Sequence, residues 1–175
     1  EKFCDDIAVA GVLHDIGKLR VNRYVYSDES DDTLVVEQMK YVRMHSAYSR
    51  DILRDENYPE NIIEAVYHHH ENYDGSGYPD GLKGTDIPEM SRILRTCDVF
   101  SALITNRSYR KAFDKKTAMA IMIDEVEDYD MEVFLAFQRV FHDDKFPEIR
   151  NLQDMASEIQ MENLKVFEEE ALKGN

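Results

Sequence analysis

The chain has 175 residues, a formal net charge of −15 and 43% hydrophobic residues, with only seven glycines and four prolines. Its apolar content excludes a disordered chain, and its length is sufficient for one domain with a buried core. The excess of acid excludes a nucleic-acid polymer as a general partner, because such binding needs a basic face. An anionic substrate would therefore need metal cations or a local cluster of Lys and Arg.

The hydrophobic pattern predicts an all-α domain, since apolar residues recur at helical spacing and no strand alternation is seen. Pro59 and Pro88 suit the first turns of helices, and Asp114 and Asp130 suit N-caps. We expect residues 21–33 to form an acidic loop. The expected helices cover, in order, residues 3–13, 34–56, 59–70, 88–106, 115–127, 131–142 and 148–172. The helix over 3–13 is apolar almost all round, which predicts that it is buried.

Two cysteines, Cys4 and Cys97, have neither disulfide nor metal-site spacing. Cys97 lies in an apolar helical pattern, so we expect reduced core cysteines and a cytoplasmic location. No apolar run approaches the roughly 18 residues that span a membrane. Direct membrane insertion is therefore not expected, although a longer parent chain could carry an anchor.

The segment LHDIGK, residues 13–18, places a His-Asp pair directly after an apolar helix. A buried carboxylate at Asp15 would need a charged partner or a metal ion. The alternative is an aspartate that caps a turn beside a hydrogen-bonded core histidine, His14. This segment alone does not decide between the two.

Two more polar residues lie on apolar helix faces. Asp98 is either a metal ligand or the partner of an arginine such as Arg92 or Arg95, and the sequence leaves both open. His45 lies on the apolar side of its amphipathic helix, where a hydrogen-bonded core histidine is the alternative to a ligand. Each residue alone is a weak indication of a site.

The segment HHHENYDGSGYPDG, residues 68–81, joins three consecutive histidines to a glycine-rich loop. On a helix His69 and His70 would project about 100° apart, so they would face different ions or different sides of one ion. Histidine and carboxylate ligands together suit Fe, Mn, Co, Ni or Zn. His68 alone fits a solvated helix end, which is the simpler interpretation for that residue.

The order His-Asp-x-x-x-Lys, His, His-His-Glu and Asp resembles the HD superfamily of metal-dependent phosphohydrolases. The longer pattern HHENYDGSGYPDGLKGTDIP followed by RILRTCDVFSALITNRSYR resembles the HD-GYP family, bacterial phosphodiesterases of cyclic di-GMP. The resemblance covers about residues 4–141. It implies an HD-domain/phosphodiesterase-like helical bundle of about seven helices, with a catalytic domain over 1–142 and a helical extension over 143–175.

The resemblance also implies the roles of individual residues. Asp15 would bridge two metal ions, and two or three divalent ions would be bound, iron or manganese first, with cobalt, nickel and zinc as alternatives. Such ions bind phosphodiester oxygens and lower the pKa of a water. The implied metal ligands are His14, Asp15, His45, His69, His70 and Asp98. Lys18, with Asp15, would serve catalysis as a charge stabiliser or proton donor. The implied contacts to the cyclic dinucleotide come from Gly77, Tyr78, Arg107 and Arg110.

The chain departs from the family pattern at several positions. The family has a further histidine ligand upstream of the His-Asp pair, so we expect either a segment truncated relative to the family or an incomplete metal site. Ser101 stands where a second aspartate is usual, Ser49 where glycine is common and Ser108 where proline is usual. The acidic stretch over residues 20–38 replaces the usual segment after the lysine.

The leading interpretation is a metal-dependent phosphodiesterase that hydrolyses cyclic di-GMP, or a related cyclic dinucleotide, in bacterial second-messenger signalling. One alternative is a catalytically weak signalling module that binds protein partners through the Gly-Tyr-Pro loop. Another is an HD phosphohydrolase that acts on a different nucleotide phosphate ester. The oligomeric state stays open, with a homodimer among the alternatives.

Overall fold

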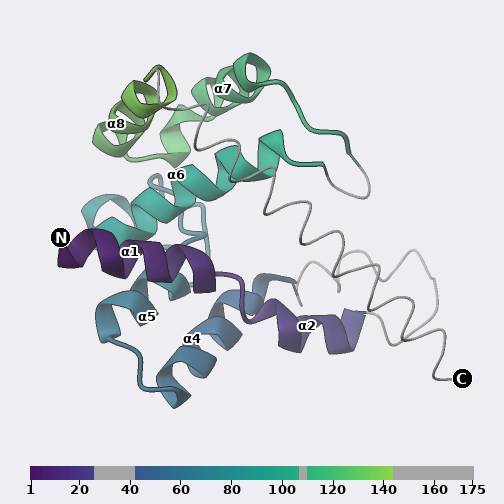
Figure 1. Cartoon of the computed structure of the whole chain (residues 1–175), viewed down its shortest axis with the longest axis vertical. Helices are drawn as coiled ribbons and strands as arrows, with labels where there is room; N and C mark the ends of the chain where they lie inside the picture. Colours follow the sequence, from purple (N-terminus) through teal and green to yellow (C-terminus); the bar gives the residue numbers. More distant parts are fainter. Residues whose placement is uncertain (26–41, 107–109, 144–175) are drawn as a thin grey trace, which may run out of the picture.

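The computed structural model describes residues 1–25, 42–106 and 110–143. The helices are α1 (Lys2–Leu13), α2 (Lys18–Val25), α4 (His45–Asp55), α5 (Glu60–Tyr67), α6 (Glu89–Ile104), α7 (Lys115–Asp124) and α8 (Met131–Phe141). Two 3-10 helices, η1 (Gly84–Asp86) and η2 (Val126–Asp128), lie in connections. The described residues contain no β-strand, so the all-α prediction is confirmed (Figure 1). The expected helix over 148–172 and almost all of the extension over 143–175 lie outside the described residues.

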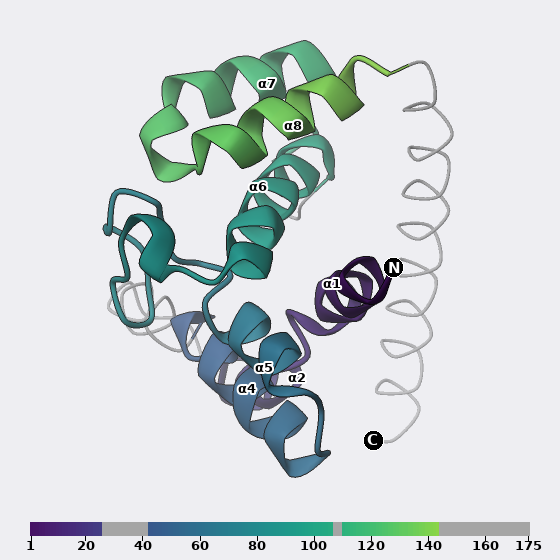
Figure 2. The same cartoon turned by 90° about the vertical axis from the view of Figure 1, so that its left-hand side faces the viewer.

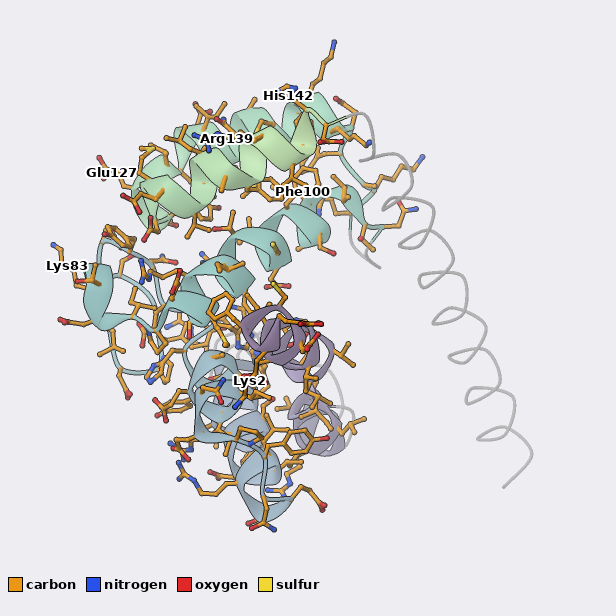
Figure 3. The ribbon with its side chains drawn as sticks, turned by 60° about the vertical axis from the view of Figure 1, so that its left-hand side comes forward. Lys2, Lys83, Phe100, Glu127, Arg139 and His142 are labelled. Carbon is orange, nitrogen blue, oxygen red and sulfur yellow. The ribbon has the colours of Figure 1, made fainter. Side chains whose placement is uncertain are left out.

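Helix α6 connects two packing regions. Figure 2 shows it between the α7–α8 pair and the group formed by α1, α2, α4 and α5. The first core, on the side of α1, α4 and α5, contains Ala10, Leu53, Ile62, Ile63, Ala65, Val66, Met90 and Leu94. The second core, under α7 and α8, contains Phe100, Ala118, Met119, Met122, Tyr129 and Phe134. Phe100 marks the half of α6 that faces the second core (Figure 3).

The starts of α7 and α8 follow capping signals in the sequence. The Asp114 side chain accepts hydrogen bonds from the N–H groups of Lys116 and Thr117, as expected for an N-cap. Asp130 does the same for the N–H groups of Glu132 and Val133 at the start of α8. The predicted N-caps of α7 and α8 are therefore confirmed. They could be predicted because a capping signal is local and needs no tertiary information.

Other predicted boundaries are wrong. Residues 18–25 form α2 where a loop was expected from residue 21, because Val21 is buried and α2 packs against α4. Helix α4 begins at His45, after a turn at Met44. The expected start of that helix near residue 34 lies outside the described residues. Helix α5 ends at Tyr67, so residues 68–70 form a turn rather than a helix end.

Two burial predictions are also wrong. Only Ala10 of α1 is buried, and the Val12 side chain is 83% exposed, because just one face of α1 packs against α5 and α6. Cys4 and Cys97 are both exposed rather than in a core. Apolar composition predicts that a helix has a buried face but does not say how wide that face is.

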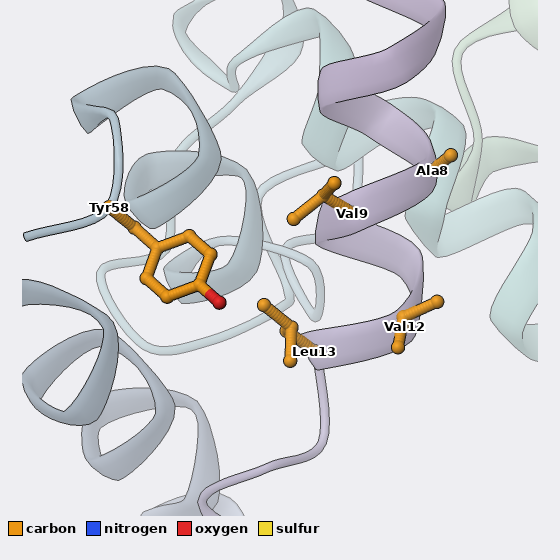
Figure 4. A pocket seen from close by; sticks show the side chains of 5 residues that line it. All are labelled: Ala8, Val9, Val12, Leu13 and Tyr58. Carbon is orange, nitrogen blue, oxygen red and sulfur yellow. The ribbon is translucent and has the colours of Figure 1, made fainter. Parts of the chain in front are cut away.

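An apolar groove lies between α1 and the connection from α4 to α5. It is lined by Ala8, Val9, Val12, Leu13 and Tyr58 (Figure 4). The Tyr58 hydroxyl is the polar group among these side chains, and none of them is a histidine or a carboxylate. Within the described ranges, no helix is both long and apolar enough to cross a membrane.

Candidate metal centre

The His-Asp pair lies in a tight turn between α1 and α2 (Figure 1). Within this turn the N–H of Ile16 donates to the Leu13 carbonyl, and the N–H of Lys18 donates to the Asp15 carbonyl. The Lys18 ammonium forms an ion pair with Oδ2 of Asp15. The turn therefore projects a carboxylate and an adjacent cation from the end of α1.

Backbone carbonyls fix the ring orientation of three histidines. Nδ1 of His14 lies 2.7 Å from the Gly11 carbonyl oxygen, and Nδ1 of His45 and His69 hydrogen-bond to the carbonyls of Val42 and Val66. A carbonyl oxygen can only accept, so each Nδ1 carries the proton. In a neutral imidazole the opposite nitrogen, Nε2, is then a bare lone pair. This arrangement is typical of metal-binding histidines, whose second nitrogen is held by a carbonyl or carboxylate.

The Nε2 lone pairs of His45 and His69 point at one another. Nε2 of His45 lies 3.4 Å from Nε2 of His69 and 3.2 Å from Nε2 of His70. It also lies 3.2 Å from Oδ1 of Asp15, a buried oxygen that has no hydrogen-bond partner among the described residues. Between His45 and His69 both facing atoms are acceptors, so their contact is repulsive unless a cation lies between them.

The spacing fits such a cation. Two ligand atoms bound at about 2.1 Å with bond angles near 90–109° lie about 3.0–3.4 Å apart. The ligand atoms of Asp15, His45, His69 and His70 all lie within 4.8 Å of one another. We call these four residues the His-Asp cluster. Its donor set, three imidazoles and a carboxylate, suits a divalent transition metal.

His14 and Asp98 form a second group beside this cluster. Nε2 of His14 lies 3.6 Å from Oδ1 of Asp98 and 3.3 Å from Oδ2 of Asp15. Asp15 thus turns one oxygen toward His45 and the other toward His14. The first core places α6, which carries Asp98, against α1 and α5, and this packing brings the two groups together.

Burial keeps the imidazoles of the cluster neutral. It lowers the pKa of His69 to about 4, and burial together with the charge of His69 lowers the pKa of His70 to about 2. Burial also lowers the pKa of His45. Neutral imidazole is the form that binds a metal, so no proton has to be removed first.

In the second group, hydrogen bonds and neighbouring charges outweigh the effect of burial on the pKa values. Burial alone would lower the pKa of His14, but hydrogen bonds to Asp15 and Asp98 raise it to about 10. Burial would raise the pKa of Asp98, but the hydrogen bond from His14 lowers it to about 2. The pKa of Asp15 is likewise held well below its usual range by His14 and Lys18, against the effect of burial. Either a proton on His14 or a divalent cation would balance the negative charge of these carboxylates.

The glycine-rich loop is held by the buried Glu71 carboxylate. Oε1 accepts the N–H groups of Asp80 and Gly81, at 2.8 and 3.1 Å, and Oε2 accepts that of Leu82 at 3.1 Å. Three backbone donors therefore converge on one side chain. We name residues 72–82 the Gly-Tyr-Pro loop, and Glu71, which directly precedes it, holds its end.

The same loop supports His70. The N–H of Tyr78 donates to the His70 carbonyl at 3.1 Å, and the Tyr78 ring stacks on the His70 ring at 4.8 Å between centroids. A Cβ at Gly77 would lie 2.2 Å from the Asn72 nitrogen and 2.5 Å from the His70 oxygen, so only glycine fits there. The Arg43 guanidinium lies over the Tyr78 ring, 5.1 Å from its centroid. Burial raises the pKa of Tyr78 to about 12, which keeps its hydroxyl neutral.

Not every predicted site residue comes to this centre. Arg110 donates to the carbonyls of Ala102, Leu103 and Lys111 and lies over the Phe113 ring, so it closes the end of α6 rather than facing the histidines. Arg107 lies outside the described residues. His142 lies at the end of α8, on the side of the second core (Figure 3).

Sequence reasoning missed the contributions of three buried side chains. His68 is not a solvated helix end: its Nε2 lies 3.2 Å from Glu64 and its Nδ1 lies 3.6 Å from Glu71. The sequence pattern predicts no role for Glu71, whose carboxylate holds the loop. Ser49 is a departure from the family pattern in the sequence, and its hydroxyl contacts the His-Asp turn. The presence of an acid directly before a glycine-rich loop was the available signal for Glu71.

The chain is similar to known proteins over most of its length. The sequence profile of the HD domain matches residues 1–133. The chain is 35% identical to 3'3'-cGAMP-specific phosphodiesterase 3 of Vibrio cholerae over 76% of its own length and 29% of that protein. It is 32% identical to a cyclic di-GMP phosphodiesterase of Pseudomonas aeruginosa over 75% of its own length and 32% of that protein.

A solved structure shares the fold. The crystal structure of a cyclic GMP-AMP specific phosphodiesterase of V. cholerae superposes with a TM-score of 0.57 and 18% identity, over 81% of this chain and 39% of that one. The chain thus spans about a third of the length of these curated relatives. With the profile match over most of its length, the chain belongs to the HD domain family, in its HD-GYP branch.

Proposed function

We propose that the protein is a metal-dependent phosphodiesterase that hydrolyses a cyclic dinucleotide, cyclic di-GMP or 3'3'-cGAMP. The observation that carries the proposal is the His-Asp cluster, where bare Nε2 lone pairs and an unpaired Asp15 oxygen face one point. The names of the relatives in V. cholerae and P. aeruginosa support this class of substrate.

Two sets of residues would hold the metal ions. Asp15, His45, His69 and His70 suit one ion, and His14 with Asp98 suits a second, with Asp15 shared between them. The ions supply positive charge that binds phosphodiester oxygens and lowers the pKa of a water. This supply of charge resolves the conflict between a net charge of −15 and an anionic substrate.

Lys18 extends the positive charge of the centre. Its ammonium pairs with Oδ2 of Asp15, and its side chain is 44% exposed, so it can turn toward a bound phosphate. There it would stabilise charge on the phosphate or give a proton to the leaving oxygen. Asp15 pairs with Lys18 and would also bind metal, which would couple these two parts of the site.

Tyr78 and Arg43 provide a platform beside the centre. The Tyr78 ring contacts both the His70 ring and the Arg43 guanidinium, and the Tyr78 N–H donates to the His70 carbonyl. An aromatic ring and an arginine suit a stacked base and a phosphate oxygen, respectively. Gly77 keeps the loop close to this platform. Arg107 stays a predicted phosphate contact on the basis of the family pattern.

Iron or manganese is the proposed metal, with cobalt, nickel and zinc as alternatives for the same imidazole and carboxylate donors. We also propose a cytoplasmic location, in line with a nucleotide second messenger as substrate. Protein partners at the Gly-Tyr-Pro loop and a homodimer are compatible with this function.

The test is a product assay. Protein loaded with Fe²⁺ without oxygen, or with Mn²⁺, Co²⁺ or Ni²⁺, is incubated with cyclic di-GMP and with 3'3'-cGAMP, and products are separated by chromatography. We expect a linear dinucleotide or mononucleotides. His69→Ala should lose more than about 100-fold in rate, since even outer partners of a metal site contribute about 10–100-fold. His142→Ala, at the end of α8, is the matched control and should keep its rate. Absence of turnover with all four ions would contradict the proposal.

A second candidate is a catalytically weak module that binds partners. It is favoured by Arg110, whose guanidinium is occupied by α6 carbonyls instead of facing the cluster. Elemental analysis separates the two functions. Less than one metal ion per chain after loading, together with no turnover, would favour the binding module.

A further inference from the structure

Ser49 lies on α4, one turn after His45, and is fully buried. Its hydroxyl connects two helices through the backbone of the His-Asp turn. The N–H of Gly17 donates to Oγ of Ser49 at 2.8 Å, and the same Oγ donates to the His14 carbonyl at 2.9 Å. One side chain thus acts as acceptor and donor to the segment that carries His14 and Asp15.

The Ser49 hydroxyl bonds to the backbone groups of the turn that have no partner within the turn itself. The N–H groups of Ile16 and Lys18 find carbonyls within three residues, at Leu13 and Asp15. The Gly17 N–H and the His14 carbonyl instead bond to Ser49 on α4. A buried backbone donor or acceptor left without a partner costs about 1–3 kcal/mol. The hydroxyl of Ser49 therefore favours this one placement of the turn on α4.

The turn and α4 are in direct backbone contact. A Cβ at Gly17 would lie 2.1 Å from the His45 carbonyl oxygen and 2.5 Å from the Ser49 nitrogen. The contact thus spans the helical turn from His45 to Ser49. A shift of the Ser49 contact would be passed to the distance between Asp15 and His45.

That distance is part of the metal centre. Oδ1 of Asp15 and Nε2 of His45 lie 3.2 Å apart, which is the spacing of two ligands on one ion. Asp15 comes from the turn, and His45 comes from α4. Their relative position therefore depends on how the turn is seated, and Ser49 makes the side-chain bonds that seat it.

We propose that Ser49 is a positioning residue, which holds the His-Asp turn in register with His45 and thereby sets the affinity of the cluster for a divalent cation. This inference rests on the proposed metal centre and adds a residue that does not itself face the ions. Ser49 acts through the backbone of His14 and Gly17 and not through contact with the substrate.

The test measures binding of Mn²⁺ alone, by the EPR signal of the free ion, with no substrate present. Ser49→Ala should bind Mn²⁺ about 10–100-fold more weakly, the range found for outer partners of metal ligands. Ser91→Ala is the matched control, because Ser91 is also fully buried and its hydroxyl donates to the carbonyls of Glu64 and Ala65, away from the turn. Its melting temperature should fall, while its affinity for Mn²⁺ stays unchanged.

Ser49→Cys provides a second variant in case Ser49→Ala does not fold. The thiol has a similar size but is a weak donor and acceptor, so we expect a smaller loss of Mn²⁺ affinity, of about 3–10-fold. Equal Mn²⁺ affinities of the unaltered protein and both Ser49 variants would overturn the proposed role of Ser49 but not the metal centre. Equal losses in Ser49→Ala and Ser91→Ala would do the same. No Mn²⁺ binding by the unaltered protein would overturn the metal centre itself, and Ser49's role with it.

Discussion

Two connections deliver ligands to the same centre, but different parts of the chain hold them. The turn with His14 and Asp15 is seated on α4 by Ser49, which is more than 30 positions away in the chain. The Gly-Tyr-Pro loop is closed by Glu71, which directly precedes it in the chain. The first connection depends on the packing of two helices, and the second is organised largely by its own residues.

This difference separates two ways in which a buried polar site is kept in shape. A loop with its own carboxylate can keep its form when neighbouring helices shift. A turn bonded to another helix changes with that helix. The His-Asp turn is therefore the more sensitive of the two to the packing of the first core, and the loop is the more sensitive to loss of one side chain.

The largest expected effect comes from Gly17→Ala. The new Cβ would lie 2.1 Å from the His45 carbonyl oxygen and 2.5 Å from the Ser49 nitrogen, and neither backbone atom can move away without moving α4. We expect a loss of about 3 kcal/mol or more in the free energy of unfolding, as for severe overpacking, with loss of Mn²⁺ binding. Urea unfolding and EPR measure the two effects.

Gly11→Ala is the matched control for this substitution. Its Cβ would make an ordinary contact, 3.6 Å from Cδ2 of Leu94, inside α1. Alanine in a helix should stabilise by about 0.5–1 kcal/mol relative to glycine. If Gly17→Ala were as stable as Gly11→Ala, the turn would not be in backbone contact with α4.

Glu71→Ala should have the next largest effect, and it should be local. Three backbone N–H groups would lose their charged acceptor. We expect the free energy of unfolding to fall by about 2–4 kcal/mol, and by less where water replaces the lost acceptor. Hydrogen exchange should speed up at the amides of residues 80–82, while the amides of α7 and α8 stay protected. Asp74→Ala removes an exposed acid of the same loop and should leave these amides unchanged. Faster exchange over the whole chain would contradict a self-contained loop.

The smallest expected effect concerns the second core. Asp130 caps α8 and pairs with Arg92 on α6. Burial would raise its pKa, but the hydrogen bonds from Arg92 and the α8 N–H groups outweigh burial and lower it. Asp130→Asn keeps a capping oxygen but loses the charge, so we expect a loss of about 1 kcal/mol at neutral pH with Mn²⁺ binding unchanged.

The pH dependence of this variant follows from the direction of the shift. A carboxylate with a depressed pKa in the folded protein stabilises it above the pKa of the unfolded chain, about 3.9, and the stabilisation is lost as the pH falls through the folded value. The difference in unfolding free energy between the unaltered protein and Asp130→Asn should therefore shrink below about pH 3.9. Urea titrations at several pH values measure it. A difference that grows on acidification would contradict the ion pair with Arg92.

Much of the fold and part of the site were predictable, for local reasons. Asp114 and Asp130 are N-caps because a short acid next to free N–H groups needs only the first turn of a helix. The end of α5 was missed because the turn at residues 68–70 depends on a bond between the His70 carbonyl and the Tyr78 N–H. Arg110 was assigned to substrate from the family pattern, whereas its carbonyl partners are set by how the chain leaves α6.

By itself the sequence determined the helical class, the helix caps and the types of donor atom available for a metal, because these depend on side-chain chemistry and near neighbours. Only the tertiary structure decided that Nε2 of His45 and His69 and an oxygen of Asp15 face one point. It also decided that Ser49 seats the turn while Glu71 closes the loop. The physical reason is that a metal centre needs ångström distances between atoms from different helices, and helix packing, not local sequence, sets those distances.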